Sequence, residues 1–78
     1  MNQERRKLIS AQISALQDIE HALNDITEAE QEAYDNMPEG LHGSDRHEAI
    51  SEALSQLEEA LESIRSACDS LSEATGGV

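Results

Sequence analysis

The feature that most constrains this fold is a seven-residue repeat in the second half of the chain. Seven apolar residues recur there at alternating spacings of four and three: Ile50, Leu54, Leu57, Leu61, Ile64, Cys68 and Leu71. This pattern predicts a long helix with one buried seam. Such a helix needs a partner, which can lie within the chain, on another copy or on a different protein.

An alanine column runs beside this seam and widens the apolar face. Its members, one every seven residues, are Ala53, Ala60, Ala67 and Ala74. With Leu54 at heptad position a, the alanines occupy position g, so the face is three positions wide rather than two. A two-stranded coiled coil needs only positions a and d. We therefore favour a four-helix bundle made from two hairpins over a coiled-coil-like dimer.

The first half of the chain predicts another helix, over about residues 3–36, with Asn2 as its N-cap. Its apolar residues are less regular, because Ile13, Leu16 and Ile19 follow one another at two consecutive spacings of three. This irregularity is a stammer in a heptad count. We expect a helix that is bent or presents two faces. We predict that Leu16, Ile19, Leu23 and Ile26 of this helix form the oligomer core together with the seven apolar residues of the repeat in the second half.

Pro38 separates the two predicted helices, since proline disfavours helix at the preceding residue and lacks a backbone N–H. The loop is predicted over residues 37–43, and so short a connection favours antiparallel neighbours.

Ser44 or Asp45 is the expected cap of the second helix, predicted over about residues 44–74. Gly76 can adopt a left-handed cap, and residues 75–78 are expected to fray. The chain is thus read as one all-α antiparallel hairpin domain over residues 1–78.

The size of the chain favours self-association. It has 78 residues, one aromatic side chain and one cysteine, so an intrachain disulfide is excluded. Domains this short often depend on disulfides, metals or oligomerisation. We expect a homo-oligomer, with a dimer favoured.

The net charge is -12, from 17 acidic and five basic residues. Direct binding to nucleic acid or to an anionic membrane is therefore not expected. No run of 18 apolar residues predicts a membrane span. The basic N-terminal segment is not followed by a signal-peptide pattern, and a single cysteine is typical of the reducing cytoplasm.

The acids of the first helix form a stripe opposite its apolar residues. This acidic stripe consists of Asp18, Asp25, Glu28, Glu32 and Asp35. It is either an ordinary solvated face or a negative surface that docks onto a basic protein. The loop offers a second candidate binding surface, formed by Tyr34, Met37, Glu39 and Leu41, which can instead be the packed end of the bundle.

The other candidate side chains do not form a recognisable catalytic or metal site. His42 and His47 flank the start of the second helix, but their spacing matches no zinc motif. Cys68 lies on the apolar seam, where it is expected to behave as a small hydrophobic residue. We expect no catalytic residue, no cofactor, no metal and no enzyme activity.

The only basic cluster is Arg5, Arg6 and Lys7. In an antiparallel hairpin it lies near Asp69 and Glu73, with which it can pair. Binding to a partner is the alternative use of these cations.

A resemblance to a known class of proteins is carried by the turn and the segment after it. It rests on residues 35–41 (DNMPEGL), on Ser44, Asp45 and Arg46, and on a following helix rich in Ala, Leu and Glu. The second half of the chain resembles short uncharacterised bacteriophage and prophage proteins that are similar to helical hairpins with an Asn-x-Pro-Glu-x-Leu turn. The resemblance implies a small acidic protein that blocks or adapts a host protein, such as a defence protein, in the host cytoplasm. The predicted function is therefore non-catalytic protein binding through the acidic helix faces and the loop. The alternative is a purely structural oligomerisation module.

Overall fold

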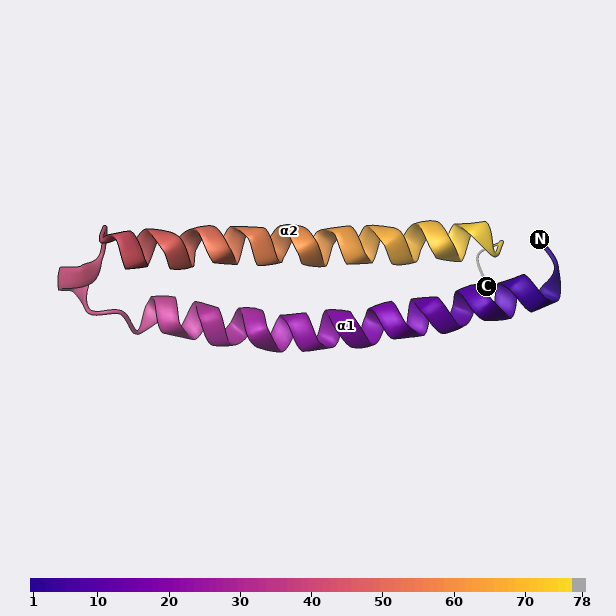
Figure 1. Cartoon of the computed structure of the whole chain (residues 1–78), viewed down its shortest axis with the longest axis horizontal. Helices are drawn as coiled ribbons and strands as arrows, with labels where there is room; N and C mark the ends of the chain where they lie inside the picture. Colours follow the sequence, from indigo (N-terminus) through magenta and orange to yellow (C-terminus); the bar gives the residue numbers. More distant parts are fainter. Residues whose placement is uncertain (77–78) are drawn as a thin grey trace.

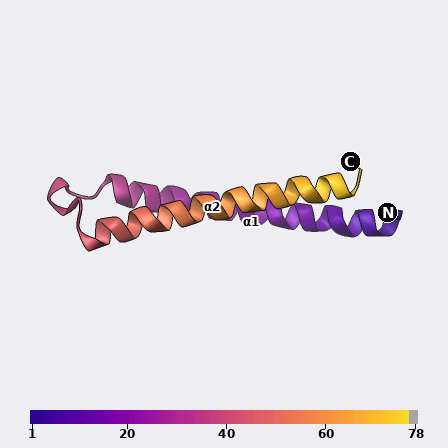
Figure 2. The same cartoon turned by 90° about the horizontal axis from the view of Figure 1, so that it is seen from above.

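The computed structural model describes residues 1–76 and consists of two long helices joined by a short turn. Helix α1 spans Gln3–Asp35, a single 3₁₀ turn η1 spans Glu39–Leu41, and helix α2 spans Asp45–Ala74. The two helices run antiparallel and side by side (Figures 1 and 2), in a rod of 59 × 15 × 14 Å. The predicted all-α helical hairpin is confirmed.

The helix boundaries follow from local capping. The side-chain oxygen of Asn2 accepts a hydrogen bond from the backbone N–H of Arg5 at 2.8 Å, and the hydroxyl of Ser44 accepts one from the backbone N–H of His47 at 3.2 Å. Such bonds satisfy N–H groups that have no partner inside the helix. Asn2 thus caps α1 as predicted, and Ser44 rather than Asp45 caps α2.

The turn depends on Gly43, whose φ of +84° is a conformation that side chains with a Cβ disfavour. Within the loop predicted over residues 37–43, η1 supplies one ordered turn. At the far end of α2, Gly76 has a φ of +87°, as expected for a left-handed helix cap.

The core of the hairpin is thin. Leu54 and Leu61, with 8% and 4% of their surface exposed, are the only buried apolar residues within the described part of the chain. The other members of the α2 seam are half-buried: Ile50, Leu57, Ile64, Cys68 and Leu71. Two helices cover each other on one side only, so water reaches both edges of this seam.

Thr75 extends the core beyond the last apolar residue of the seam. It follows Cys68 by seven residues, is 2% exposed, and donates its hydroxyl hydrogen to the carbonyl of Ser72 at 2.8 Å. The tail that we expected to fray from residue 75 is therefore packed at Thr75. Residues 77–78 lie outside the described residues.

Helix α1 faces α2 with a heptad seam that contains polar residues. Its half-buried members, again at alternating spacings of four and three, are Ile9, Ile13, Leu16, Glu20, Leu23, Thr27, Glu30 and Tyr34. Ile19 and Ile26, which we predicted to lie in the oligomer core, are 48% and 53% exposed in the single hairpin. The stammer is thus the point where the apolar pattern divides. One stripe continues towards α2, and the other moves to the side of the hairpin, so α1 presents two faces.

One ion pair joins the two helices in residues 1–76. The Nε–H group of Arg65 donates to the carboxylate of Glu20 at 2.6 Å. The hydroxyl of Thr27, a seam residue one heptad further along, donates to the carbonyl of Leu23 at 2.7 Å. Of the polar side chains in the α1 seam, Glu20 and Thr27 thus have hydrogen-bond partners inside the hairpin. Within residues 1–76, neither helix is long and apolar enough to cross a membrane.

Candidate interaction surface

The groove between the two helices has a polar flank on one side. There Asn24 and Thr27 of α1 lie beside Glu58 and Arg65 of α2. Nearer the chain termini, the same flank is lined by Ser10, Ile13, Gln17, Cys68, Asp69 and Ser72.

The opposite flank is apolar. Successive residues of an α-helix are about 100° apart, which places Ile19 and Ile26 across α1 from Asn24 and places the alanine column across α2 from Glu58 and Arg65. The two stripes therefore form one continuous surface, which we call the alanine–isoleucine face. Its members are Leu8, Ala15, Ile19, Ala22, Ile26, Ala29 and Ala33 of α1, and Ala53, Ala60, Ala67 and Ala74 of α2. All are exposed except Ala53, which is half-buried.

The register of the hairpin places the isoleucines of this face beside the alanine column of α2. The contact between Glu20 and Arg65 sets α1 and α2 against each other so that Ile19 and Ile26 lie at the level of the α2 segment between Ala53 and Ala67. Alanine side chains fill the surface around these two isoleucines. A second helix pair can approach such a surface closely, because a methyl group projects little from the helix.

The exposed area of the hairpin is large for its mass. The chain exposes 5693 Å², whereas a folded monomer of 8.5 kDa exposes about 4,650 Å². The excess of roughly 1,000 Å² is comparable with the area of about 800 Å² that each partner buries in a standard protein interface.

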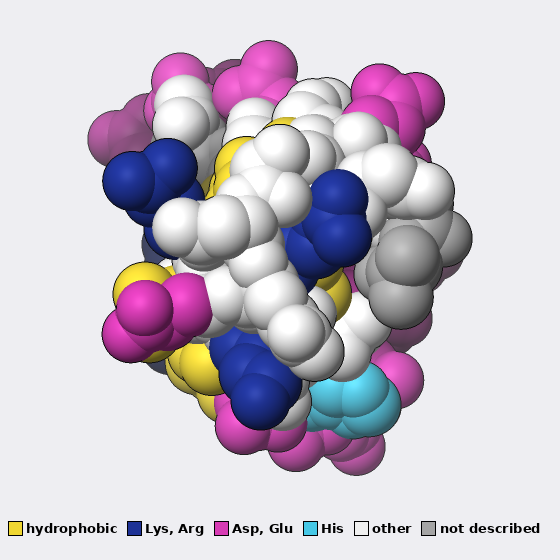
Figure 3. Space-filling view, turned by 90° about the vertical axis from the view of Figure 1, so that its right-hand side faces the viewer, with side chains coloured by type: hydrophobic (Ala, Val, Ile, Leu, Met, Phe, Trp, Pro, Cys, Tyr) yellow, Lys and Arg dark blue, Asp and Glu magenta, His cyan; other side chains and the backbone are white. Residues whose placement is uncertain are grey.

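The acidic stripe lies elsewhere on the molecule. Its five members, Asp18, Asp25, Glu28, Glu32 and Asp35, are all exposed, and the helical period turns them away from both α2 and the alanine–isoleucine face. None of them takes part in an ion pair within the described residues, although Asp35 accepts a hydrogen bond from the side chain of Gln31 at 3.0 Å. Viewed end-on, acidic side chains lie around the rim of the rod (Figure 3).

The hairpin tip is ordered by a stack of three rings. The ring centroids of Tyr34 and His47 are 4.4 Å apart, and those of His47 and His42 are 4.7 Å apart. The backbone N–H of Gly43 donates to Nδ1 of His47 at 3.3 Å, and Nε2 of His42 lies 3.1 Å from the carbonyl oxygen of Met37. A carbonyl can only accept, so Nε2 of His42 is the donor.

The candidate binding residues of the loop are divided by this packing. Tyr34 and Met37 are half-buried against the tip, whereas Glu39 and Leu41 are exposed. The ring stack therefore makes Tyr34 part of the packed hairpin tip, and of the predicted loop patch Glu39 and Leu41 are the exposed residues.

The remaining candidate side chains do not converge. Among residues 1–76 no group of three or more His, Cys, Asp or Glu residues is arranged to hold a metal ion. Cys68 is half-buried in the seam. The predicted pairing of the basic cluster with Asp69 and Glu73 is not observed, because the ion pair between Glu20 and Arg65 is the one that this part of the structure contains.

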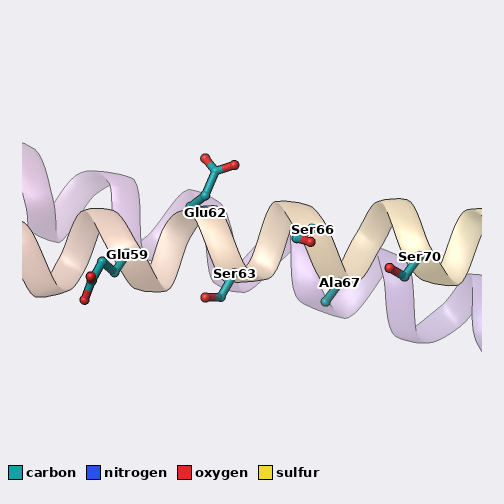
Figure 4. A pocket seen from close by; sticks show the side chains of 6 residues that line it. All are labelled: Glu59, Glu62, Ser63, Ser66, Ala67 and Ser70. Carbon is teal, nitrogen blue, oxygen red and sulfur yellow. The ribbon is translucent and has the colours of Figure 1, made fainter.

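A shallow depression on the outside of α2 arises from small side chains rather than from a built site. It is lined by Glu59, Glu62, Ser63, Ser66, Ala67 and Ser70. The two carboxylates point away from each other (Figure 4), so they do not form an acid–base pair.

Glu20 and Thr27 are the structurally important residues that the sequence reasoning missed. Both lie on the column that begins at Ile13 and ends at Tyr34, whose members recur at every seventh residue. That spacing is the signal that could have identified them, but their polar side chains concealed it. No family model matches this chain, and no match was found among curated proteins or solved structures.

Proposed function

We propose that the chain is a self-associating module in which two hairpins pack through their alanine–isoleucine faces into a four-helix bundle. The observation that carries this proposal is the position of Ile19 and Ile26. They are about half exposed in the middle of an alanine-rich surface, while the polar Glu20 and Thr27 occupy the seam of the hairpin. A homodimer buries this surface.

The expected gain is considerable. Full burial of an isoleucine contributes about 1.5–3 kcal/mol. Since Ile19 and Ile26 are already about half covered, a dimer that buries the rest of all four side chains gains about 3–6 kcal/mol from them alone. The alanines around them add contact area at little cost in side-chain entropy.

Light scattering of the double variant Ile19→Asp/Ile26→Asp tests this proposal. In the separated hairpin both positions are partly exposed to water, so the variant should remain helical but become monomeric, because an interface cannot accommodate unpaired carboxylates. Ser14→Asp is the matched control, since Ser14 is exposed on the side of α1 away from the face, and it should leave the dimer intact.

A third variant separates association from folding. Leu61→Asp places a charge at a position that is 4% exposed inside the hairpin, and it should abolish helix and dimer together. A wild-type chain that is a well-folded monomer at every concentration would contradict the proposal.

A second function is supported by the acidic stripe. Five exposed carboxylates without ion pairs lie outside the proposed dimer interface, so each copy of a dimer displays them. We propose that they dock onto a basic surface of another protein, which is the inhibitor or adaptor role that the phage-type resemblance implies. Exposed Glu39 and Leu41 at the tip extend this surface.

The test of docking compares two sets of neutral substitutions in affinity capture from host cells. Asp25→Asn, Glu28→Gln and Glu32→Gln together should lose a partner that the wild type retains, and the wild-type affinity should fall steeply with salt. The control removes three charges from exposed positions of α2, by Glu48→Gln, Glu52→Gln and Glu59→Gln. Equal loss with both sets would indicate non-specific attraction instead of docking.

A further inference from the structure

We infer that the two hairpins dock antiparallel, so that the terminal end of each copy lies beside the hairpin tip of the other. This inference rests on the proposed self-association and specifies its geometry. It is based on an uneven distribution of charge along the rod and on the position of Ile19 and Ile26 within the alanine–isoleucine face.

The charge of the hairpin is concentrated in one half. Residues 1–19 and 63–76, which form the terminal half, contain four Lys or Arg residues and four acids. Residues 20–62, which form the half with the tip, contain one Arg and thirteen acids. The net charge is therefore 0 in the first half and -12 in the second, with Glu20 and Arg65 near the boundary. Lys and Arg side chains are visible on the terminal end (Figure 3).

A parallel dimer places these two strongly negative halves side by side. The screening length is about 8 Å at physiological ionic strength, and helices packed in a bundle are about 8–10 Å apart, so salt screens this repulsion only partly. In an antiparallel dimer each negative half lies beside a neutral half that carries cations. Electrostatic complementarity of this kind selects the register and orientation of an interface.

The apolar side chains fit the same arrangement. Ala22 is about halfway between the start of α1 at Gln3 and the turn at Glu39–Leu41, and Ile19 and Ile26 lie on either side of it. A two-fold axis perpendicular to the rod near Ala22 brings Ile19 of one copy against Ile26 of the other. It also allows the two hairpins to overlap along their full length.

The basic cluster then has a use that the single hairpin does not provide. Arg5, Arg6 and Lys7 lie at the level of the partner's turn, where the acids outside the acidic stripe are Glu39 and Asp45. Cations at the start of a helix oppose its dipole, and no ion pair holds them within the described part of one chain. Ion pairs between this basic cluster and the tip of the second copy compensate for the unfavourable interaction of the cations with the helix dipole.

Pulsed electron paramagnetic resonance on nitroxide-labelled dimers tests the orientation. Cys68→Ala removes the native thiol, and Gly40→Cys then places a label at the tip, where an added Cβ meets no atom within 4 Å. Two labels at residue 40 should be separated by a distance close to the 59 Å length of the hairpin. A mixture with a Gln3→Cys variant, labelled at the exposed terminal end, should add a much shorter distance between residues 3 and 40 of different copies.

The possible failures are distinguishable. A short distance between the two residue-40 labels, in a sample whose scattering mass is that of a dimer, would overturn the antiparallel arrangement and leave self-association intact. A monomeric mass, with no dipolar coupling between copies, would overturn both the orientation and the self-association on which it depends.

Discussion

Replacement of Glu20 by leucine should make the hairpin more stable, although it removes the one ion pair between the helices in residues 1–76. Glu20 lies in the α1 seam with its side chain 21% exposed, and its partner Arg65 is 50% exposed. The pair therefore has the environment of a surface salt bridge, for which measured contributions are about 0.2–1 kcal/mol.

The gain from leucine at this position is larger than that loss. About four-fifths of the new side chain would be removed from water, which contributes about 1–2 kcal/mol. Glutamate and leucine have similar helix propensities, so the helix itself changes little. The expected net stabilisation is about 1 kcal/mol, or an increase in Tm of about 4–8 °C for a chain of this size.

Thermal and urea unfolding, followed by far-UV circular dichroism at one fixed protein concentration, would measure this change. Glu28→Leu is the matched control, because Glu28 is exposed on the outer side of α1 and its replacement should change the stability by less than about 0.5 kcal/mol. A Glu20→Leu variant that is less stable than the wild type by about 1 kcal/mol or more would refute the reasoning. The pair with Arg65 would then contribute far more than its exposure indicates.

Three further changes test the core, the turn and the tip by the same unfolding measurements. Leu61→Ala should cost about 2–5 kcal/mol, since it opens a cavity at the most buried apolar residue of the seam; a cost below about 1 kcal/mol would mean that the core is not where the structure places it. Gly43→Ala should lower the stability by about 1 kcal/mol because the φ of Gly43 is +84°. Gly40 lies in open space and has no positive φ, so Gly40→Ala should be neutral or slightly stabilising. Equal effects of the two substitutions would contradict the backbone conformation of this turn. Tyr34→Ala should lower the free energy of unfolding by at least about 1 kcal/mol, because it removes the ring stack with His47. Tyr34→Phe keeps the ring and should be as stable as the wild type. An equal loss of stability in both variants would mean that the hydroxyl, and not the ring stack, stabilises the tip.

The helices and their ends could be predicted from the sequence because they depend on local chemistry. Apolar periodicity predicted both helices, and Pro38 predicted the break between them. The two helices are capped by Asn2 and Ser44, whose side chains accept hydrogen bonds from backbone N–H groups three residues later. The outward position of the acidic stripe follows from the same period. These features need no knowledge of how the helices pack.

The choice between Ile19 and Glu20 could not be predicted in this way. Both residues continue a helical stripe from Leu16, at spacings of three and four, and hydrophobicity alone favours Ile19. Packing against α2 along a heptad seam requires the alternating spacing, which selects Glu20, and Arg65 on the facing helix supplies its partner. The exposure of Ala60 and Ala67 has a related cause, since one neighbouring helix cannot cover a face three positions wide.

The order of residues at 19–20 and 26–27 also explains why the hairpin seam contains polar side chains while isoleucines stay exposed. Glu20 and Thr27 lie in the seam, and Ile19 and Ile26, one position earlier, lie on the alanine–isoleucine face. Isoleucines at positions 20 and 27 would bury their side chains between α1 and α2 and leave a flank of alanines alone, which offers little apolar area to a partner. With the isoleucines one position earlier, about half of each side chain is instead available on the alanine–isoleucine face. Moving them should therefore shift stability from the interface to the single hairpin. The quadruple variant Ile19→Glu/Glu20→Ile/Ile26→Thr/Thr27→Ile, which has the composition of the wild type, should melt at a temperature that no longer depends on protein concentration. If its melting temperature still rises with concentration as that of the wild type does, the isoleucines do not form the interface.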